Sequence, residues 1–153
     1  MRARLALLGV VLLGGLAACG TNPTNPGAAT TNMPTDPGVK VGQSSLGPIL
    51  TDLQGRTLYA FVNDQAGNST CTDNCLASWP ALTSDKAFRT GDGTKADLLT
   101  DTKRTDGVEQ AKYGVWPLYY YAGDQGPGDI DGQNVDGLWF VVGADGKLVK
   151  KTP

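Results

Sequence analysis

The cysteines Cys71 and Cys75 are the residues whose spacing bears most directly on chemistry. On a regular helix, Cα atoms four residues apart lie about 6 Å from each other, which is within the range of a disulfide. We interpret the pair as a local disulfide, and its small loop places its stabilisation at the low end of about 2–4 kcal/mol. A redox-active pair is one alternative, and a metal site is another, although two thiolates need further ligands to hold a metal.

The chain contains no histidine, which excludes several kinds of catalysis. Nucleophilic triads of the Ser-His-Asp or Cys-His type need an imidazole as their base. Haem attachment in its usual form needs a histidine after the second cysteine of Cys-x-x-Cys. No glycine-rich phosphate or dinucleotide motif stands between a predicted strand and a helix. We therefore expect no enzyme, no catalytic residue, no cofactor and no metal.

Two aspartates, Asp64 and Asp124, follow aromatic segments at equivalent places in the chain. A pair of carboxylates is what glycoside hydrolysis uses. Each aspartate, however, precedes a glycine-containing loop, where an Asp side chain accepts hydrogen bonds from backbone N–H groups. We interpret both as turn-forming groups rather than as reagents.

The loop that begins at Asp124 is dense in oxygen ligands, which raises calcium binding as an alternative. Its further candidate ligands are Asp129, Asp131, Asn134 and Asp136. The loop lacks the ligand spacing of an EF-hand and its terminal glutamate. A solvated, turn-rich loop is the interpretation we prefer.

Aromatic residues recur at matching positions, and these positions are expected in the core because aromatic residues suit a packed, pleated surface. The repeated positions are Tyr59, Phe61, Trp79, Tyr119, Tyr121 and Trp139. Trp116 and Tyr120 have no aromatic residue at the matching position. They are the candidates for contact with a planar ligand or a glycan.

These residues follow a repeat of 60 positions. The segment 58–64 reads Leu-Tyr-Ala-Phe-Val-Asn-Asp, the segment 118–124 reads Leu-Tyr-Tyr-Tyr-Ala-Gly-Asp, and a glutamine follows each. Trp79 and Trp139 each lie 15 residues after the aspartate of their own copy. The spacing predicts two copies of one unit, and because two copies are too few for a solenoid, we expect them to share one core.

The elements that position these residues are short. Runs of apolar and β-branched residues bounded by turn signals predict strands at 46–52, 56–63, 98–104, 108–113, 117–122, 138–142 and 147–151. In the strand 56–63, Tyr59 and Phe61 fall on one face, with Leu58, Ala60 and Val62 on the other. Both faces are apolar, so this strand is expected to be covered on both sides.

One short helix is expected before Pro80, with Thr72 or Asp73 as its N-cap and an end near Trp79. The elements together predict a mainly β fold, a small antiparallel β domain built from two related repeats with one short helix. Whether it is a sandwich or a barrel does not follow from the sequence.

The N-terminal residues 1–18 are predicted to be a signal peptide. Arg2 and Arg4 precede an uncharged apolar run over 5–18, which is shorter than the roughly 20 residues that a spanning helix needs. The run ends in Leu16-Ala17-Ala18-Cys19, which resembles the lipobox of bacterial lipoproteins, with Cys19 as the lipidated residue. An ordinary secretory cleavage site is the alternative.

Cleavage before Cys19 leaves 11 basic and 15 acidic residues, because two of the 13 basic residues and none of the acids are lost. The resulting chain has no basic patch for nucleic acid. The segment 19–43 is rich in Thr, Asn, Pro and Gly and is predicted to be a flexible tether. The β domain is predicted over 44–153, with repeats at about 44–82 and 106–151. Its two cysteines are an even number in an oxidising compartment.

The phrase from Leu46 to Tyr59, the stretch from Cys71 to Pro80 and the twice-used Tyr-x-aromatic-x-x-Asp resemble the bacterial lipoproteins of the "secreted repeat of unknown function" family. The resemblance covers about residues 44–150 and implies an extracytoplasmic lipoprotein of the cell envelope with no assigned activity. The second repeat lacks the cysteine pair and has Asp131 and Asp136 in that region. Chemistry at the cysteines is therefore not shared by both repeats.

We expect a lipid-anchored envelope protein that is not an enzyme and serves as a structural or binding module. Its predicted partners are the membrane, through Cys19, and an envelope glycan or protein. A glycan- or cell-wall-binding module is the first alternative, and exposure of Trp116 and Tyr120 would favour it. A thiol-redox or electron-transfer accessory protein is the second, and a readily reduced Cys71–Cys75 bond would favour that.

Overall fold

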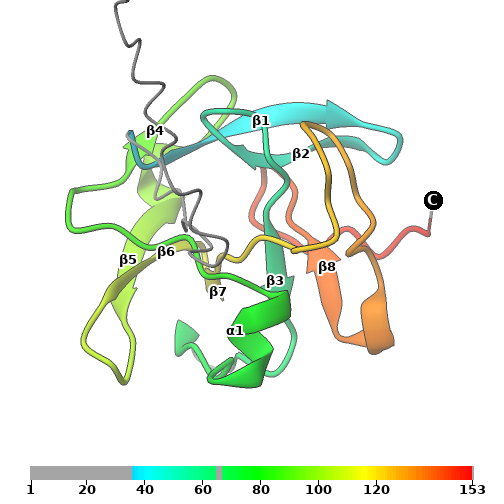
Figure 1. The fold of residues 1–153 in the computed structure, drawn as a ribbon. Helices are drawn as coiled ribbons and strands as arrows, with labels where there is room; N and C mark the ends of the chain where they lie inside the picture. The colour runs from blue at the N-terminus through cyan, green and yellow to red at the C-terminus, as the bar shows by residue number, and fades with distance from the viewer. Residues whose placement is uncertain (1–35, 65–66, 153) are drawn as a thin grey trace, which may run out of the picture. The chain divides into compact units, whose positions relative to one another are not determined.

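Short strands make up most of the regular structure, as the computed structural model shows for residues 36–64 and 67–152 (Figure 1). In chain order the elements are β1 (Gly38–Ser44), β2 (Gly47–Asp52), β3 (Tyr59–Phe61), α1 (Asn74–Ser78), β4 (Arg89–Thr90), η2 (Ala96–Leu98), β5 (Leu99–Lys103), β6 (Glu109–Tyr113), β7 (Trp116–Pro117), η3 (Val135–Gly137) and β8 (Trp139–Val141). The described strands pair in the orders β2-β1-β4, β3-β8 and β5-β6-β7. The pairing is antiparallel except between β1 and β4, which confirms the mainly β fold with one short helix.

The first hairpin corrects the predicted start of the domain. Strand β1 pairs with β2 from Val39 opposite Asp52 to Ser44 opposite Gly47. Residues 38–43 therefore belong to the fold, and assigning them to the tether 19–43 was wrong. Averaging composition over a Pro- and Gly-rich stretch concealed that Val39 is fully buried in the core. Residues 19–35 of the predicted tether lie outside the described residues.

The second hairpin repeats the first, although its loops differ in length. Leu99 of β5 faces Tyr113 of β6, as Val39 of β1 faces Asp52 of β2. The offset is thus 60 positions in the first strand and 61 in the second, and it returns to 60 at Tyr119. The chain between these paired residues is therefore one residue longer in the second repeat, and the chain from there to the repeated tyrosine is one residue shorter. The second repeat begins at β5, earlier than the predicted position 106.

The two repeats meet at Tyr59 and Tyr119. The N–H of each tyrosine donates to the carbonyl oxygen of the other, with N···O distances of 2.8 and 2.9 Å. Each aromatic segment then pairs with the other repeat: Tyr59 of β3 faces Val141 of β8, and Tyr119 faces Ala81. Residues 81 and 141 are also 60 positions apart, so the first repeat pairs with the second in the same way as the second pairs with the first. The repeats are therefore interlocked about an approximate twofold axis, as in an isologous interface.

Buried side chains form two clusters, one on each side of β3, which lies beside β8 in Figure 1. The aliphatic core consists of Val39, Leu50, Leu58, Ala60, Leu82, Ala111, Tyr113, Leu118 and Val142. The aromatic core consists of Ile49, Tyr59, Cys71, Trp79, Tyr119, Trp139 and Val141. Leu58 and Ala60 belong to the first core, Tyr59 belongs to the second, and Phe61 packs against the second. The prediction that this strand is covered on both faces is confirmed.

The predicted strands 56–63 and 117–122 are much shorter in the structure, where β3 covers only Tyr59–Phe61, and the predicted strand 147–151 is absent. Only Pro117 of the predicted strand 117–122 belongs to β7. Further along, the N–H of Tyr120 donates to the carbonyl of Pro80. Proline has no N–H, so it cannot donate a second hydrogen bond to extend the strand pairing there. The segment 147–151 follows a tight turn but is not a strand. There the side-chain amide of Gln133 donates to the carbonyls of Val149 and Lys151, at 2.6 and 2.7 Å, where a strand partner would otherwise donate.

Candidate functional site

Four aromatic rings from both repeats form a stack in the order Phe61, Trp139, Trp79 and Tyr121, in which the Tyr121 ring is tilted by 34° from that of Trp79. The distances between successive ring centroids are 4.4, 3.8 and 4.5 Å. The two indoles at the centre are parallel to within 1°. Each pair of equivalent residues, 61 with 121 and 79 with 139, occupies symmetrical places in the stack. The repeated aromatic positions thus lie together, as the sequence predicted.

The repeated tyrosines and aspartates bond across the repeats rather than within them. The hydroxyl of Tyr119 donates to Asp64 Oδ2 at 2.6 Å, and the hydroxyl of Tyr59 donates to Asp124 Oδ2 at 2.9 Å. Burial, followed by the hydrogen bond to Asp64, raises the pKa of Tyr119 to about 12. Burial and the neighbouring Asp124 raise the pKa of Tyr59 as well.

Asp64 closes the loop that leaves β3. Its Oδ1 accepts from the backbone N–H and the hydroxyl of Thr70, both at 2.7 Å. Burial raises the pKa of Asp64, while the hydrogen bonds from Tyr119 and Thr70 oppose that shift. Asp124 closes the equivalent loop by accepting from the N–H of Asp131 at 3.0 Å. Both aspartates therefore act on loops, although they reach the N–H six or seven residues on rather than the next ones.

A buried arginine, Arg104, extends this network and had no signal in the sequence. It is 6% exposed, and its guanidinium donates to Ser69 Oγ at 2.5 Å, Gln110 Oε1 at 2.7 Å and the carbonyl of Cys71 at 2.7 Å. Ser69 Oγ is also 2.6 Å from the hydroxyl of Tyr119. The positive charge is thus tied to the cysteine loop and to the Tyr119–Asp64 pair.

A disulfide joins Cys71 and Cys75, with their Cα atoms 5.4 Å apart, as predicted. It crosses the start of α1, whose N-cap is Asp73 without a hydrogen bond from its side chain. Cys71 is 1% exposed and belongs to the aromatic core, whereas Cys75 is half-buried. The disulfide therefore fixes the segment that leads to Trp79.

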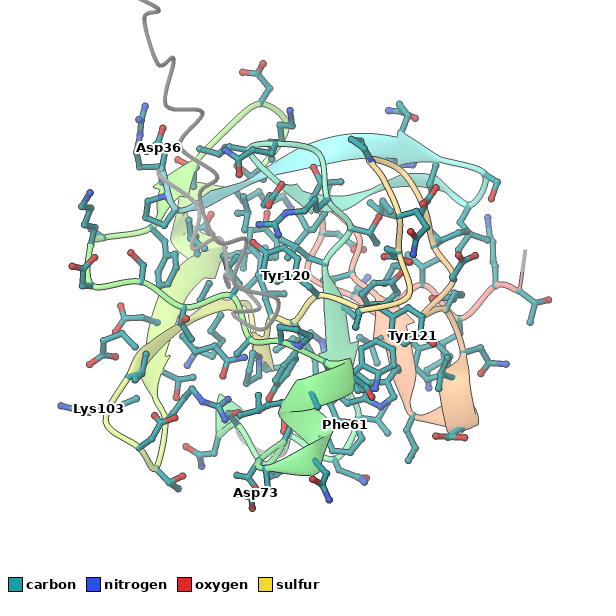
Figure 2. The ribbon with its side chains drawn as sticks, viewed as in Figure 1. Asp36, Phe61, Asp73, Lys103, Tyr120 and Tyr121 are labelled. Atoms are coloured by element: carbon teal, nitrogen blue, oxygen red, sulfur yellow. A yellow bond between two sulfur atoms is a disulfide. The ribbon has the colours of Figure 1, made fainter. Side chains whose placement is uncertain are left out.

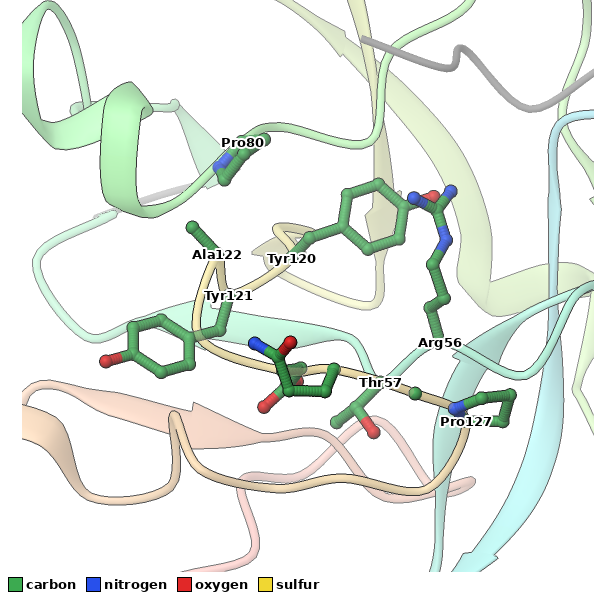
Figure 3. Close-up of a pocket in the computed structure, with 10 residues that line it drawn as sticks. Arg56, Thr57, Pro80, Tyr120, Tyr121, Ala122 and Pro127 are labelled. Carbon is green, nitrogen blue, oxygen red and sulfur yellow. The ribbon is translucent and has the colours of Figure 1, made fainter. Parts of the chain in front are cut away.

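A cleft of about 330 Å³ opens beside the stack, on the side of Tyr121 (Figure 3). Its volume is within the usual range for small-molecule sites. It is lined by Arg56, Thr57, Pro80, Tyr120, Tyr121, Ala122, Asp124, Gln125, Gly126 and Pro127. Figure 3 shows the rings of Tyr120 and Tyr121 pointing to opposite sides of their backbone, with Tyr120 directed toward Arg56.

Arg56 and Tyr120 hold each other in place at the cleft. The guanidinium carbon lies 4.1 Å from the centre of the Tyr120 ring, a cation–π distance. Arg56 Nε donates to the buried Asp52 at 2.7 Å, and the Tyr120 hydroxyl donates to the same oxygen at 3.1 Å. Burial and the neighbouring Asp52 raise the pKa of Tyr120. The Tyr120 side chain is therefore held in one position. Tyr120 and Tyr121 are the two aromatic residues that line the cleft.

At the cleft the two repeats differ in sequence. Position 60 is alanine where position 120 is tyrosine, and position 116 is tryptophan where position 56 is arginine. Both candidates without an aromatic counterpart pack against the aliphatic core, and of the two Tyr120 also lines the cleft. The sequence reasoning missed Arg56, although the same comparison between repeats marks it as clearly as Trp116.

The acidic loop beside the cleft uses its carboxylates on its own backbone. Asp129 Oδ2 accepts from the N–H groups of Gln125 and Gly126, both at 2.8 Å. Within residues 36–64 and 67–152, no group of three or more acidic or cysteine side chains is arranged to hold a metal ion. The exposed acids and bases elsewhere, such as Asp73 and Lys103, project outward (Figure 2).

Asp124 is expected to make stability fall as the pH rises through about 6. Burial is the main cause that raises its pKa to about 6, and the charges of Asp131 and Asp129 add to it. Because the folded pKa exceeds the unfolded value of about 4, this contribution is complete below pH 4 and is lost as the pH rises through 6. The loss is on the order of 1 kcal/mol, since solvent screens the partly exposed carboxyl.

Urea midpoints at pH 4 and pH 7 for the wild type and Asp124→Asn measure this contribution. The variant is expected to lose part of the difference between the two pH values. Asp131→Asn is the matched test, because it removes a charge that raises the pKa of Asp124 and keeps the carboxyl. An Asp124 carboxyl that titrates near pH 4 in the wild type would contradict the assignment.

The chain belongs to the lipoprotein family described as the secreted repeat of unknown function. The family model matches twice, over residues 40–83 and 101–143. The two matches coincide with the two copies of the interlocked unit, each of which includes its first hairpin. Neither the curated proteins nor the solved structures give a match to this chain.

The family description supports an extracytoplasmic protein of the envelope. None of the helices among the described residues is long and apolar enough to cross a membrane. Cys19 and the predicted signal peptide lie outside the described residues.

Proposed function

We propose that this protein is a lipid-anchored, non-enzymatic module of the cell envelope that binds a segment of an envelope glycan in the cleft beside Tyr121. The family supports the envelope location, and the motif Leu16-Ala17-Ala18-Cys19 supports the anchor. The acceptor for the lipid is Cys19. The partner in the cleft is a neutral stretch of sugar rings.

The observation that carries this proposal is the asymmetry of the cleft. The interlocked aromatic core needs the residues that the repeats share, and these explain the fold. Arg56 and Tyr120 are not shared, yet they contact each other and line the same cleft. A pair that departs from the repeat and meets at one open surface is better explained by a ligand than by packing.

The chemistry of the cleft suits a sugar. The rings of Tyr121 and the prolines Pro80 and Pro127 offer apolar surfaces to the C–H face of a pyranose. Asp124, Gln125 and Arg56 offer acceptors and donors to its hydroxyl groups. Asp52 already neutralises Arg56 at 2.7 Å, so the cleft has no unpaired positive charge for a polyanion. A neutral glycan is therefore preferred over an anionic polymer.

Thiol-redox exchange is less well supported at the Cys71–Cys75 bond. Exchange requires a thiolate to approach one of the two sulfurs in line with the bond. Cys71 is 1% exposed, and its carbonyl is held by Arg104. Cys71 is thus held in the core and only Cys75 is half-buried, so a structural role is the simpler explanation.

Tyr121→Ala is expected to abolish binding to purified peptidoglycan in a sedimentation assay. The matched control is Phe61→Ala, which removes the equivalent ring from the other end of the stack, away from the cleft. Both variants lose similar packing, so a difference between them reports the ligand. Equal binding by Tyr121→Ala, Phe61→Ala and the wild type would overturn the proposal, as would absence of binding by the wild type.

Cys19→Ala is expected to release the protein from membranes and to abolish labelling by a fatty-acid probe. Stable anchoring needs more than one acyl chain, and the lipidated cysteine is the residue that carries these chains. The measurement is the distribution of the protein between membrane and soluble fractions. Retention of the unlabelled variant in the membrane fraction would refute the anchor.

A further inference from the structure

The outer edges of the two equivalent hairpins differ. In the first repeat, the segment that links the repeats covers the edge of β1, where β4 pairs with it. The carbonyl of Val39 accepts from the N–H of Gly91 at 2.7 Å, and the N–H of Val41 donates to the carbonyl of Asp92 at 2.8 Å. In the second repeat, β5 takes the place of β1. Among the described residues, no strand pairs with the outer edge of β5.

The backbone groups on the outer edge of β5 belong to alternate residues, as in any antiparallel pair. The N–H of Ala111 donates to the carbonyl of Leu82, on the side of β6 that faces away from β5. Asp101 lies opposite Ala111, so the N–H and C=O of Asp101 point away from β6. Lys103, two residues further on, has the same orientation. Asp101 is equivalent to Val41, so its outward N–H corresponds to the one that the linking segment accepts from in the first repeat.

We propose that the outer edge of β5 pairs with the same edge of a second copy of this chain, antiparallel and with twofold symmetry. In the register that we propose, Asp101 lies opposite the partner's Lys103, and Lys103 lies opposite the partner's Asp101. Thr102 then lies on the twofold axis, opposite the partner's Thr102. Each of the two charged pairs exchanges both of its N–H···O bonds, because the backbone groups of Asp101 and Lys103 point outward. The contact is isologous, so it closes at two copies.

The charges of β5 select both the partner and the register. Asp101 and Lys103 are exposed and, being two residues apart, lie on the same face of the strand; Figure 2 shows Lys103 projecting outward. The first repeat has the uncharged Val41 and Gln43 at these positions. Opposite charges directly across two strands favour pairing, and like charges oppose it. The neighbouring symmetrical registers would place Asp101 opposite itself or Lys103 opposite itself. A single charge protects an edge strand from pairing, whereas this pair of opposite charges is complementary to its own copy.

The pairing of two copies is independent of the glycan ligand, because no residue of β5 lines the cleft. An interface of one short strand falls below the roughly 1,000 Å² that a stable protein–protein interface buries. The dimer is therefore expected to dissociate on dilution and to form where the copies are concentrated, as they are on one membrane. A method that traps the contact in the cells that make the protein is the appropriate test.

Disulfide trapping in intact cells that express the full chain tests the register. Thr102→Cys places two thiols on facing residues whose Cα atoms are about 4.5 Å apart, within disulfide range, so mild oxidation is expected to give a covalent dimer on a non-reducing gel. Thr100→Cys is the matched control. It lies on the same face and is more exposed, but it would be about 14 Å from its counterpart and is expected to stay monomeric. Absence of the dimer in Thr102→Cys, or equal trapping in both variants, would overturn the proposal.

Charge reversal in the Thr102→Cys protein tests that the partner is a second copy. Asp101→Lys and Lys103→Asp each turn two attractive pairs into repulsive ones and are expected to lower trapping about tenfold. The variant with both changes restores the pairs in reverse order and is expected to recover trapping. Asp92→Lys, an exposed site in the linking segment, makes the same change in net charge as Asp101→Lys and is expected to have no effect. Near-ultraviolet circular dichroism shows that each variant is folded. Trapping that is unchanged by the single reversals, or not recovered in the double one, would contradict self-pairing.

Discussion

Trp79→Ala is expected to destabilise the folded chain by about 3–5 kcal/mol, the usual cost of truncating a large buried aromatic residue. Trp79 is 5% exposed and contacts three rings, among them Trp139 of the other repeat at 3.8 Å. The variant leaves a cavity at the interface of the two repeats, and side chains of both repeats would have to move to fill it. The measurement is the free energy of unfolding from urea titration.

Trp139→Ala is expected to cost a similar amount, because it removes the symmetrical half of the same contact. Trp116→Ala is the control, since Trp116 is half-buried and packs outside the aromatic core, so its cost is expected to be smaller. The double variant Trp79→Ala, Trp139→Ala is expected to cost less than the sum of the single variants, by about 0.5–1.5 kcal/mol or more. Additive effects would show that the two indoles do not support each other.

Asp64→Ala is expected to cost about 2–4 kcal/mol, because it leaves buried donors without their acceptor. The donors are the N–H and the hydroxyl of Thr70 and the hydroxyl of Tyr119, which keeps Ser69 as a neighbour. Arg104 also loses a nearby negative charge. Asp64→Asn is expected to be milder, since it keeps one acceptor oxygen.

The same order, Ala worse than Asn, is expected at Asp124, with smaller values because that carboxyl is partly exposed. Urea midpoints for the four variants, taken at one pH, give the comparison. If alanine is tolerated at both positions without loss of stability, the loop-closing role fails, and a role for the carboxylates in chemistry becomes the better explanation.

The repeat was visible in the sequence because it depends on residue types at a fixed offset. The Tyr-x-aromatic-x-x-Asp phrase and its tryptophan gave the number of units, the expectation of one shared core and the two apolar faces of β3. The partner of each aspartate was not visible. Asp64 bonds to Tyr119, 55 residues later, and nothing near Asp64 distinguishes that tyrosine from Tyr59 of its own repeat.

Other features depend on pairing that composition does not reveal. Strand β1 has few apolar residues, and a full antiparallel partner, rather than its own sequence, makes it a strand. Gly42 has room for no side chain, since a Cβ there would lie 2.6 Å from Thr51 Cγ2, so a residue typical of tethers is required by the sheet. In the segment 147–151, the side chain of Gln133 donates the hydrogen bonds that a neighbouring strand would otherwise donate.

Only part of the cleft could be predicted from the sequence. Tyr120 was marked because it breaks the repeat, and Arg56 breaks it by the same criterion at the position of Trp116. What the sequence could not give is that Arg56 and Tyr120 touch, since the contact crosses between repeats. In this fold, positions where the two repeats differ, such as 56 and 120, mark the cleft, whereas positions that they share mark the core.

The central feature of this fold is that the two repeats form one interlocked unit. Residue-resolved urea unfolding, followed by the amide signals of the described residues in nuclear magnetic resonance spectra, tests it most directly. Because Tyr59 and Tyr119 bond to each other and each aromatic segment pairs with the opposite repeat, amides of β1 to β3 and of β5 to β8 are expected to share one midpoint. Asp64→Ala is expected to lower that midpoint equally in both repeats. Separate midpoints, or a shift confined to the first repeat, would contradict the interlocked fold.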